Sequence, residues 1–285
     1  MVQAPGQTDQ LYLHAVLRVA ELFEASAGFV AAYSAPCPGK QTPNEDAMAV
    51  IPFDEHALVL VVADGMGGMR AGDEASRIAV TTLRDALQHA RQAQRSMRSG
   101  ILNGIEQANQ VITSLGIGAA TTLVVVECDH HRVRPYHVGD SMAMVVGQRG
   151  KIKLQTVSHS PVGFAYEAGF LNEHQAMRHE QRHLVSNAVG NADMRIEMGS
   201  LFKLTSRDTL LLATDGLFDN LTHDEIVQMI RKGALEEAAS RLAEHATRRM
   251  TQPQPQHPCK PDDLSFLLFR MNNPQHARRI NHTTK

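Results

Sequence analysis

Acidic residues recur in this chain at points where apolar stretches begin or end. They are Glu45–Asp46, Asp64, Asp140, Asp215 and Asp262–Asp263. Acids in adjoining turns of a packed sheet converge on one pocket, where they repel one another and raise their own pKa values unless cations neutralise them. A pocket that offers only oxygen ligands favours Mg²⁺ or Mn²⁺ over Zn²⁺. Two such ions could hold a hydroxide between them and clamp a phosphoryl group for in-line attack.

The alternative is that each aspartate caps its own turn and binds nothing. The segment at Asp64 alone would favour this alternative, because Asp-Gly is a common hairpin turn. However, residues 58–62 are a short Leu and Val run typical of a buried strand, and Gly65, Gly67 and Gly68 follow it. Glycines there allow sharp turns and a close approach of the main chain to a ligand. The repetition of acids at so many strand ends makes the metal pocket the stronger hypothesis.

The elements that would position these acids can be outlined from hydrophobic periodicity. Helical spacing predicts helices over residues 11–25, 71–90, 101–115, 224–232 and 235–249, with Thr222 capping the fourth. Apolar runs rich in β-branched residues predict strands over residues 28–34, 47–52, 58–62, 121–127, 132–136, 142–146, 151–156, 201–204, 208–214 and 264–270. Residues 157–187 have no sustained period, so we expect a lid-like insertion with one or two short helices. The polar tail, residues 271–285, is predicted to be disordered.

Composition limits the function classes. The chain has 285 residues, 43% of them hydrophobic, and a formal net charge of −2, which gives no reason to expect nucleic acid or a membrane as partner. Its three cysteines are scattered and form no Cys-x-x-Cys pair, which argues against a disulfide framework or a thiolate metal site. No secretory leader or membrane-spanning run is evident, so we expect a cytoplasmic protein. The fifteen histidines lack metal-ligand spacing, and we expect most of them at the surface.

Seven segments resemble the metal-dependent protein phosphatases, the type 2C serine/threonine phosphatase family, in its bacterial form. They occur in the family's order and span residues 28–270. The segments are NEDA at 44–47, ADGMGG at 63–68 with AG at 71–72 and AS at 75–76, GAATT at 118–122, HVGDS at 137–141, VG at 189–190, TDGLFD at 214–219 and DDLS at 262–265. Each segment alone is weak, but the ordered set is specific.

The resemblance implies an α+β fold with four layers, α-β-β-α, in which two antiparallel sheets pack face to face with helices outside. It implies one phosphatase domain over residues 1–270, of which residues 1–25 form an amino-terminal extension containing the first expected helix. Periodicity alone does not establish this layering.

The resemblance also implies roles for individual residues. Asp64 should bridge two metal ions, and the backbone carbonyl of Gly65 should bind the second. Asp215 and Asp262 should bind the first ion, with Asp263 in the place of a family asparagine. Glu45 and Asp46 should act mainly through metal-bound waters, and a third, weaker ion should lie near Asp140, with Asp219 close to it. The expected catalytic residues are therefore Asp46, Asp64 and Asp215.

The position expected to bind the substrate phosphate departs from the family pattern. The family often has an arginine four residues before the glutamate, where it binds the substrate phosphate. Here that residue is Gln41, with Lys40 beside it. A lysine supplies a point charge but not the two parallel hydrogen bonds of an arginine, so Lys40 and Gln41 are weak candidates for phosphate binding.

The function that follows is hydrolysis of phosphoserine and phosphothreonine in proteins by a metal-bridged hydroxide, with Mn²⁺ or Mg²⁺ as cofactor. Expected partners are phosphorylated proteins and a cognate serine/threonine kinase, and we expect a monomer. One alternative is a pseudophosphatase, a regulatory module that binds phosphoproteins without turnover. Another is a hydrolase of small phosphorylated metabolites. Because every expected acid is present, catalysis is the favoured hypothesis.

Overall fold

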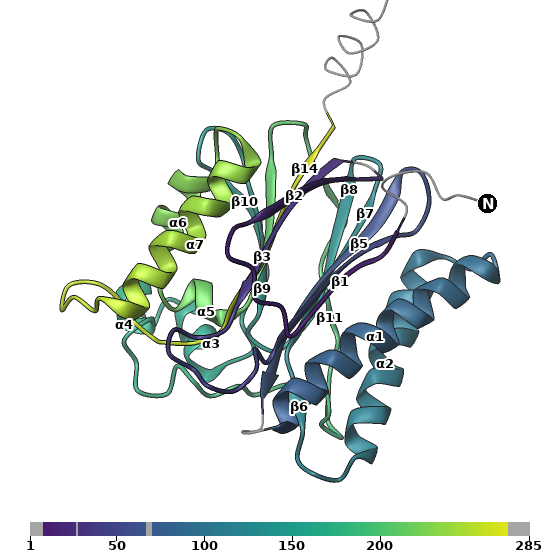
Figure 1. Cartoon of the computed structure of the whole chain (residues 1–285), viewed down its shortest axis with the longest axis horizontal. Coiled ribbons are helices and arrows are strands. Elements are labelled where there is room, and N and C mark those ends of the chain that lie inside the picture. The colour runs from purple at the N-terminus through teal and green to yellow at the C-terminus, as the bar shows by residue number, and fades with distance from the viewer. Residues whose placement is uncertain (1–7, 27, 67–69, 273–285) are drawn as a thin grey trace, which may run out of the picture.

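Two antiparallel β-sheets packed face to face form the centre of the molecule (Figure 1). The computed structural model describes residues 8–26, 28–66 and 70–272, so Gly67, Gly68 and Met69 of the glycine motif lie outside the described residues, as does the tail from residue 273. The eight-stranded sheet has the order β1 (Gln10–Leu13), β4 (Asp46–Pro52), β5 (Ala57–Met66), β7 (Leu123–Asp129), β8 (Arg132–Val138) and β11 (Glu197–Met198), with β6 (Ala120–Thr121) on β5 and β12 (Phe202–Lys203) on β8. The six-stranded sheet has the order β10 (Ile152–Gln155), β9 (Met142–Val146), β13 (Thr209–Ala213), β14 (Leu264–Met271), β3 (Gly28–Ala35) and β2 (Glu21–Ala25).

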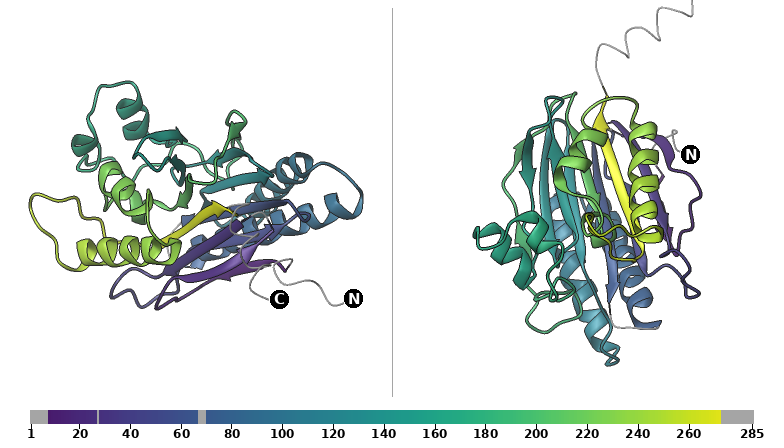
Figure 2. Two further views of the ribbon diagram at one scale, coloured as in Figure 1. Left: turned by 90° about the horizontal axis from the view of Figure 1, so that it is seen from above. Right: turned by 90° about the vertical axis from the view of Figure 1, so that its left-hand side faces the viewer.

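Helices cover the outer face of each sheet. The long pair α1 (Arg70–Gln92) and α2 (Met97–Ser114) packs on the eight-stranded sheet, and α6 (His223–Ile230) and α7 (Leu235–Thr251) pack on the six-stranded sheet. Figures 1 and 2 show these four layers, with the short helices α3 (Pro161–Glu167), α4 (Glu173–Ala176) and α5 (Asp215–Phe218) near one another. The predicted α-β-β-α fold is confirmed.

Strand alternation divides the buried residues into separate cores. In β4, Ala47, Ala49 and Ile51 face α1 and α2, whereas Met48 and Val50 face the other sheet. Because both faces of this strand are buried, its sequence is apolar at nearly every position instead of alternating with polar residues. The central strands are thereby fixed in register, which is what holds the acids at their ends in place.

The predicted helix over residues 11–25 is wrong. This segment forms two strands: β1 pairs with β4, and β2 pairs with β3. In β1, Leu11 and Leu13 pack toward the helices, while Tyr12 packs between the sheets. Because both faces of this strand are apolar, its sequence does not alternate and resembles a helical pattern. Val16 and Val19, two apolar residues of this segment, are 67% and 71% exposed.

The other four helices are confirmed, with ends that differ from the predicted ones by a few residues. Thr222 caps α6 as predicted: its hydroxyl accepts from the amide of Glu225, whose side chain bonds back to the Thr222 amide. The insertion holds α3 and α4, in agreement with the expected one or two short helices. Periodicity did not reveal β11 or α5, because each is shorter than five residues.

Within the described residues, no helix combines the length and the apolar character that a membrane crossing requires.

Candidate functional site

Pairing between β4 and β5 brings the first two acids together. Asp46 and Asp64 are direct partners across this antiparallel pair. The carbonyl of Asp64 accepts hydrogen bonds from the Thr121 hydroxyl (2.7 Å) and the Thr122 amide (2.8 Å), and the Asp64 amide donates to the Thr122 hydroxyl (3.1 Å). The Thr122 hydroxyl also bonds to that of Ser141 (2.6 Å). These hydroxyls fix the backbone at Asp64, so their role is structural.

Gly65 lies where no side chain fits. A Cβ atom on it would be 2.2 Å from the carbonyl oxygen of Gly72 in the first turns of α1 and 2.7 Å from that of Glu45. The Ser76 hydroxyl of α1 donates to the same Glu45 carbonyl (2.6 Å). Helix α1 therefore holds the end of β5 against the loop before β4, and the glycine is required for this close backbone approach.

The six-stranded sheet contributes the next two acids. Asp215 opens α5 directly after β13, and Asp262 precedes β14, the strand that pairs with β13. The Thr214 hydroxyl donates to Asp46 Oδ2 (3.1 Å), which connects the two sheets at this point. Gly216 allows α5 to lie close to the backbone before β14, because a Cβ atom on Gly216 would be 1.9 Å from the Asp263 carbonyl oxygen.

The predicted convergence of acids is present. Burial raises the pKa of Asp64 well above the usual range, and the charges of Asp46, Asp215, Asp262 and Asp140 raise it further. Burial is also the main cause of the raised pKa values of Asp46 and Asp140, with neighbouring carboxylates adding to the effect. The pKa of Asp140 rises to about 8. We call Asp46, Asp64, Asp140, Asp215, Asp219 and Asp262 the acid cluster.

Three oxygens of the acid cluster are buried without a hydrogen-bond partner: Asp46 Oδ1, Asp215 Oδ1 and Asp219 Oδ2. Buried polar atoms in folded proteins are nearly always paired, so an unpaired carboxylate oxygen marks a place where a cation fits. The donors are all carboxylates, the set that Mg²⁺ and Mn²⁺ prefer. The residues present therefore fit the metal ions that the sequence implies.

Lys260 is a site residue that the sequence did not reveal. Its ammonium bonds to Asp215 Oδ2 and lies 3.1 Å from both Asp219 Oδ2 and Asp262 Oδ2. Burial would lower the pKa of this lysine, but the charges of the three acids outweigh burial and raise it. The sequence predicts no helix or strand over residues 251–261, and a single lysine in such a segment carries no signal of its partners.

The two candidate phosphate-binding residues are placed differently. Lys40 Nζ lies 2.6 Å from Asp263 Oδ2 and 2.7 Å from Glu45 Oε2, so its charge is already shared between two acids. Asp263 also accepts from the backbone amides of Cys37 and Glu45 (2.7 Å each) and thereby closes the loop between them. Gln41 is exposed and bonds only to the Gly39 carbonyl (3.2 Å).

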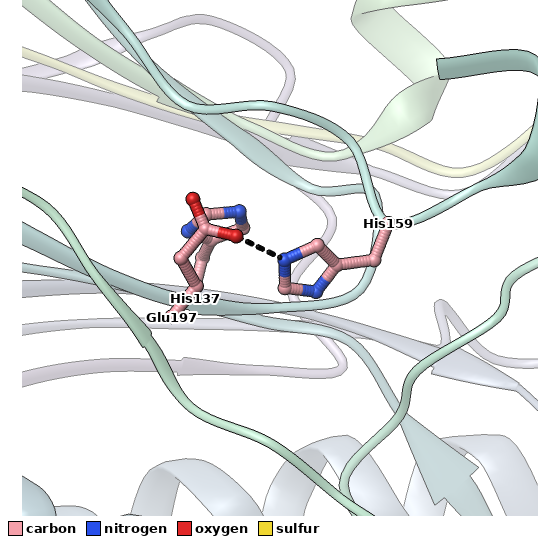
Figure 3. Close-up of side chains that lie close together, drawn as sticks. All are labelled: His137, His159 and Glu197. Carbon is pink, nitrogen blue, oxygen red and sulfur yellow. Dashed lines mark hydrogen bonds and ion pairs between the residues drawn. The ribbon is translucent and has the colours of Figure 1, made fainter. Parts of the chain in front are cut away.

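A second polar cluster adjoins the acid cluster, formed by His137, His159 and Glu197 (Figure 3). One potential ligand atom from each lies within 4.8 Å of the others. However, His159 Nδ1 accepts from the Gly139 amide (3.1 Å) and Asn187 Nδ2 (2.9 Å), and His159 Nε2 faces Glu197 Oε2 (3.0 Å). Both nitrogens of His159 are thus in use, and the ring supports the turn that carries Asp140. His137 and His159 are buried, unlike the surface histidines we expected.

The two histidine rings are stacked, with centroids 4.3 Å apart and planes inclined by 26°. A metal ion lies in the plane of each imidazole that binds it, and two stacked rings do not share such a position. We therefore regard this histidine cluster as structural.

A cavity lies beside the acid cluster, between it and the insertion. Asp140, Asp215 and Asp219 line one part, and Val162, Tyr166, Met177 and Arg182 of the insertion line another. The Arg182 guanidinium bonds to the carbonyls of Met177 and Cys259 (3.0 Å for the latter), whereas Arg178 is exposed. A substrate bound at the acids would contact the insertion here.

Comparison with known proteins gives the class to which this fold and site belong. The family model described as protein phosphatase 2C matches residues 37–254. The chain belongs to this family. Protein phosphatase PhpP of Streptococcus pneumoniae is 32% identical over 199 residues, 67% of this chain and 80% of that protein.

Solved structures show the same fold. The serine/threonine phosphatase of S. agalactiae is similar with a TM-score of 0.73 and 26% identity over 85% of this chain and 99% of that chain. The catalytic domain of the serine/threonine protein phosphatase PstP, solved with two manganese ions, has a TM-score of 0.65 and 22% identity over 86% of this chain and 98% of that chain.

Proposed function

We propose that this protein is a metal-dependent phosphatase that hydrolyses phosphoserine and phosphothreonine in proteins. The observation that carries the proposal is a set of buried carboxylates with unpartnered oxygens, Asp46 Oδ1 and Asp215 Oδ1, inside a chain of the protein phosphatase 2C family. The relatives named as serine/threonine phosphatases support the substrate class.

The residues that would hold two divalent ions are those that meet at the ends of β4, β5 and β13. Asp64, the Gly65 carbonyl, Asp215 and Asp262 would hold the ions directly, and Glu45 and Asp46 would act mainly through bound water. Ions bound there supply positive charge that stabilises the phosphoryl oxygens in the transition state and lowers the pKa of water. Mn²⁺ and Mg²⁺ both suit this donor set.

The protein's own contribution is to hold the acids in position before substrate arrives. The Thr121 and Thr122 bonds fix Asp64, and the Thr214 hydroxyl fixes Asp46. Such rigid placement is what makes electrostatic stabilisation effective, because no reorganisation is needed during the reaction.

Covalent catalysis by cysteine does not fit the structure. Burial raises the pKa of both the Cys37 and the Cys128 thiols, so neither is a ready thiolate nucleophile. Ser141 bonds to Thr122 instead of to a general base. Direct attack by water on phosphorus is the mechanism that we propose.

The test is hydrolysis of a phosphothreonine peptide with Mn²⁺ and with EDTA, by wild type, Asp215→Asn and Asp224→Asn. Asp224 is an exposed acid of α6 and controls for the substitution itself. We expect turnover that needs Mn²⁺, is lost in Asp215→Asn and persists in Asp224→Asn. A wild type that binds Mn²⁺ yet leaves the peptide intact would refute the proposal and favour binding without turnover.

Phosphoprotein substrates imply a serine/threonine kinase that produces them, and we infer such a kinase as partner. A monomeric state and a cytoplasmic location stay predictions from the sequence.

A further inference from the structure

Lys260 is held in place by more than its acids. Its backbone amide donates to Asn220 Oδ1 (2.9 Å), and its carbonyl accepts from Asn220 Nδ2 (2.7 Å). Asn220 is fully buried, and its Nδ2 also donates to the carbonyl of Gly216 beside Asp215 (3.0 Å). Pro261 follows Lys260 and restricts it to extended backbone conformations. The lysine is thus anchored to the same short helix, α5, that carries Asp215.

We propose that the ammonium group of Lys260 is a built-in cation of the metal centre, occupying the side of the acid cluster formed by Asp215, Asp219 and Asp262. Divalent ions would then bind at the remaining oxygens, those of Asp46 and Asp64 and Oδ1 of Asp215. The inference rests on the proposed metal site and assigns a charge of the protein itself to one part of it.

The distribution of oxygens supports this division. Lys260 bonds to Oδ2 of Asp215, whereas Oδ1 of the same carboxylate is buried and without a partner. Asp215 therefore presents one oxygen to the ammonium and leaves the other for an ion. Asp46 Oδ1, a second oxygen without a hydrogen-bond partner, belongs to the opposite sheet, whereas the third, Asp219 Oδ2, lies 3.1 Å from the ammonium.

Charge gives a second argument. The acid cluster has six carboxylates, and two divalent ions leave about two of their negative charges uncompensated. The ammonium of Lys260 neutralises one of these without any ion from solution. Its side chain is only 19% exposed and lies among three acids, whereas Lys153, which bonds to both oxygens of Asp208, serves a single acid.

The consequence is a defined number of bound ions. In a variant without the ammonium, Asp215 Oδ2, Asp219 and Asp262 would face one another with no cation between them, and this all-carboxylate group would accept a further divalent ion. In the wild type the same place is filled at any metal concentration.

The experiment counts Mn²⁺ bound per chain by calorimetric titration and by the spin-resonance signal of free Mn²⁺, using the full metal-stripped protein. Wild type is compared with Lys260→Met, and Lys260→Gln serves as a second neutral variant should the first fail to fold. Lys260→Arg keeps the charge, and Lys153→Met is the matched control at an ion pair outside the acid cluster. We expect one more Mn²⁺ per chain in the neutral Lys260 variants than in wild type, with Lys260→Arg and Lys153→Met like wild type. A lower Tm of Lys260→Met in EDTA should accompany the change.

Two results would overturn the proposal. One is an unchanged ion count in the neutral variants. The other is tighter Mn²⁺ binding at an unchanged count, which would mean that the ammonium competes for an ion's place instead of having its own. Failure of the proposed function is a separate result, seen as a wild type that does not hydrolyse the phosphopeptide.

Discussion

The acid cluster and the histidine cluster adjoin the same turn at Gly139–Asp140, yet they differ in how many of their polar atoms have partners. In the histidine cluster, both nitrogens of His159 and Nε2 of His137 have partners, only Nδ1 of His137 lacks one, and Glu197 is half exposed to solvent. In the acid cluster, carboxylates are buried against one another, and oxygens of Asp46 and Asp215 lack partners. A folded chain retains such unfavourable burial where it serves binding or catalysis, whereas satisfied polar groups stabilise structure. The difference separates the proposed active site from its support.

The largest effect is expected for Asp64→Asn. The asparagine has the same shape but neither bridges cations nor repels its neighbours, so kcat/KM should fall by about 10³-fold or more while the Tm in EDTA rises. Initial rates with a phosphothreonine peptide and thermal melts in EDTA measure the two changes. Retained activity, or a fall in Tm, would show that the burial of Asp64 is structural and would remove the contrast between the clusters.

Lys40→Met tests whether this lysine binds phosphate or positions the loop. Because Lys40 is paired with Glu45 and the buried Asp263, we expect a less stable protein, by about 3 kcal/mol, and a fall in kcat/KM of about tenfold. The inhibition constant for inorganic phosphate should stay at the wild-type value. A higher inhibition constant would instead mark Lys40 as a phosphate ligand. The control is Gln41→Ala at the exposed neighbouring residue, which should resemble wild type in stability and in kcat/KM.

The pH dependence of stability should differ with and without metal. Burial and neighbouring charge raise the pKa of Asp140 to about 8 and of Asp219 and Asp262 to about 6, above the unfolded value near 4. Between about pH 4 and pH 8 the folded metal-free protein binds more protons than the unfolded chain. Its stability is therefore highest at acidic pH and falls as pH rises through about 6 and 8. Ions compete with these protons, so the stabilisation by Mn²⁺ should grow over the same range.

Thermal melts at pH 5.5, 7 and 8.5, in EDTA and in Mn²⁺, measure this dependence. We expect the Tm in EDTA to fall by about 5 °C or more across the range. A flat Tm in EDTA would mean that the acids are already neutralised in the metal-free protein.

The sequence predicted the chemistry better than it predicted the local structure. The acids at strand ends were sufficient to predict the convergence at Asp64, because register between buried strands leaves little freedom. The layering, in contrast, was predicted only from the resemblance to a known family. The segment at residues 11–25 was assigned wrongly, because β1 and β2 are short edge strands whose pairing partners, rather than their own residues, determine their conformation.

Long-range contacts of single side chains could not be predicted from the sequence. Lys260 meets Asp215 and Asp219 only after the segment before β14 folds back on α5, and no pattern within residues 251–261 signals that contact. The engagement of Lys40 with Asp263 likewise depends on two segments more than 200 residues apart. Departures from a family pattern indicate where to look for such pairs, but only the fold shows the partner.

The smallest effect is expected for Glu197→Gln. The amide oxygen of glutamine can still accept from His159 Nε2, so the bond that orients the ring under Gly139 is retained. Since Glu197 is half exposed, loss of its charge should change stability by less than about 1 kcal/mol and kcat/KM by less than about threefold. Peptide hydrolysis across pH 6 to 9 is the measurement, with Asp224→Asn as an exposed control. A hundredfold loss, or a shifted pH profile, would mean that the histidine cluster exchanges protons during the reaction, and the separation of active site from support would no longer hold.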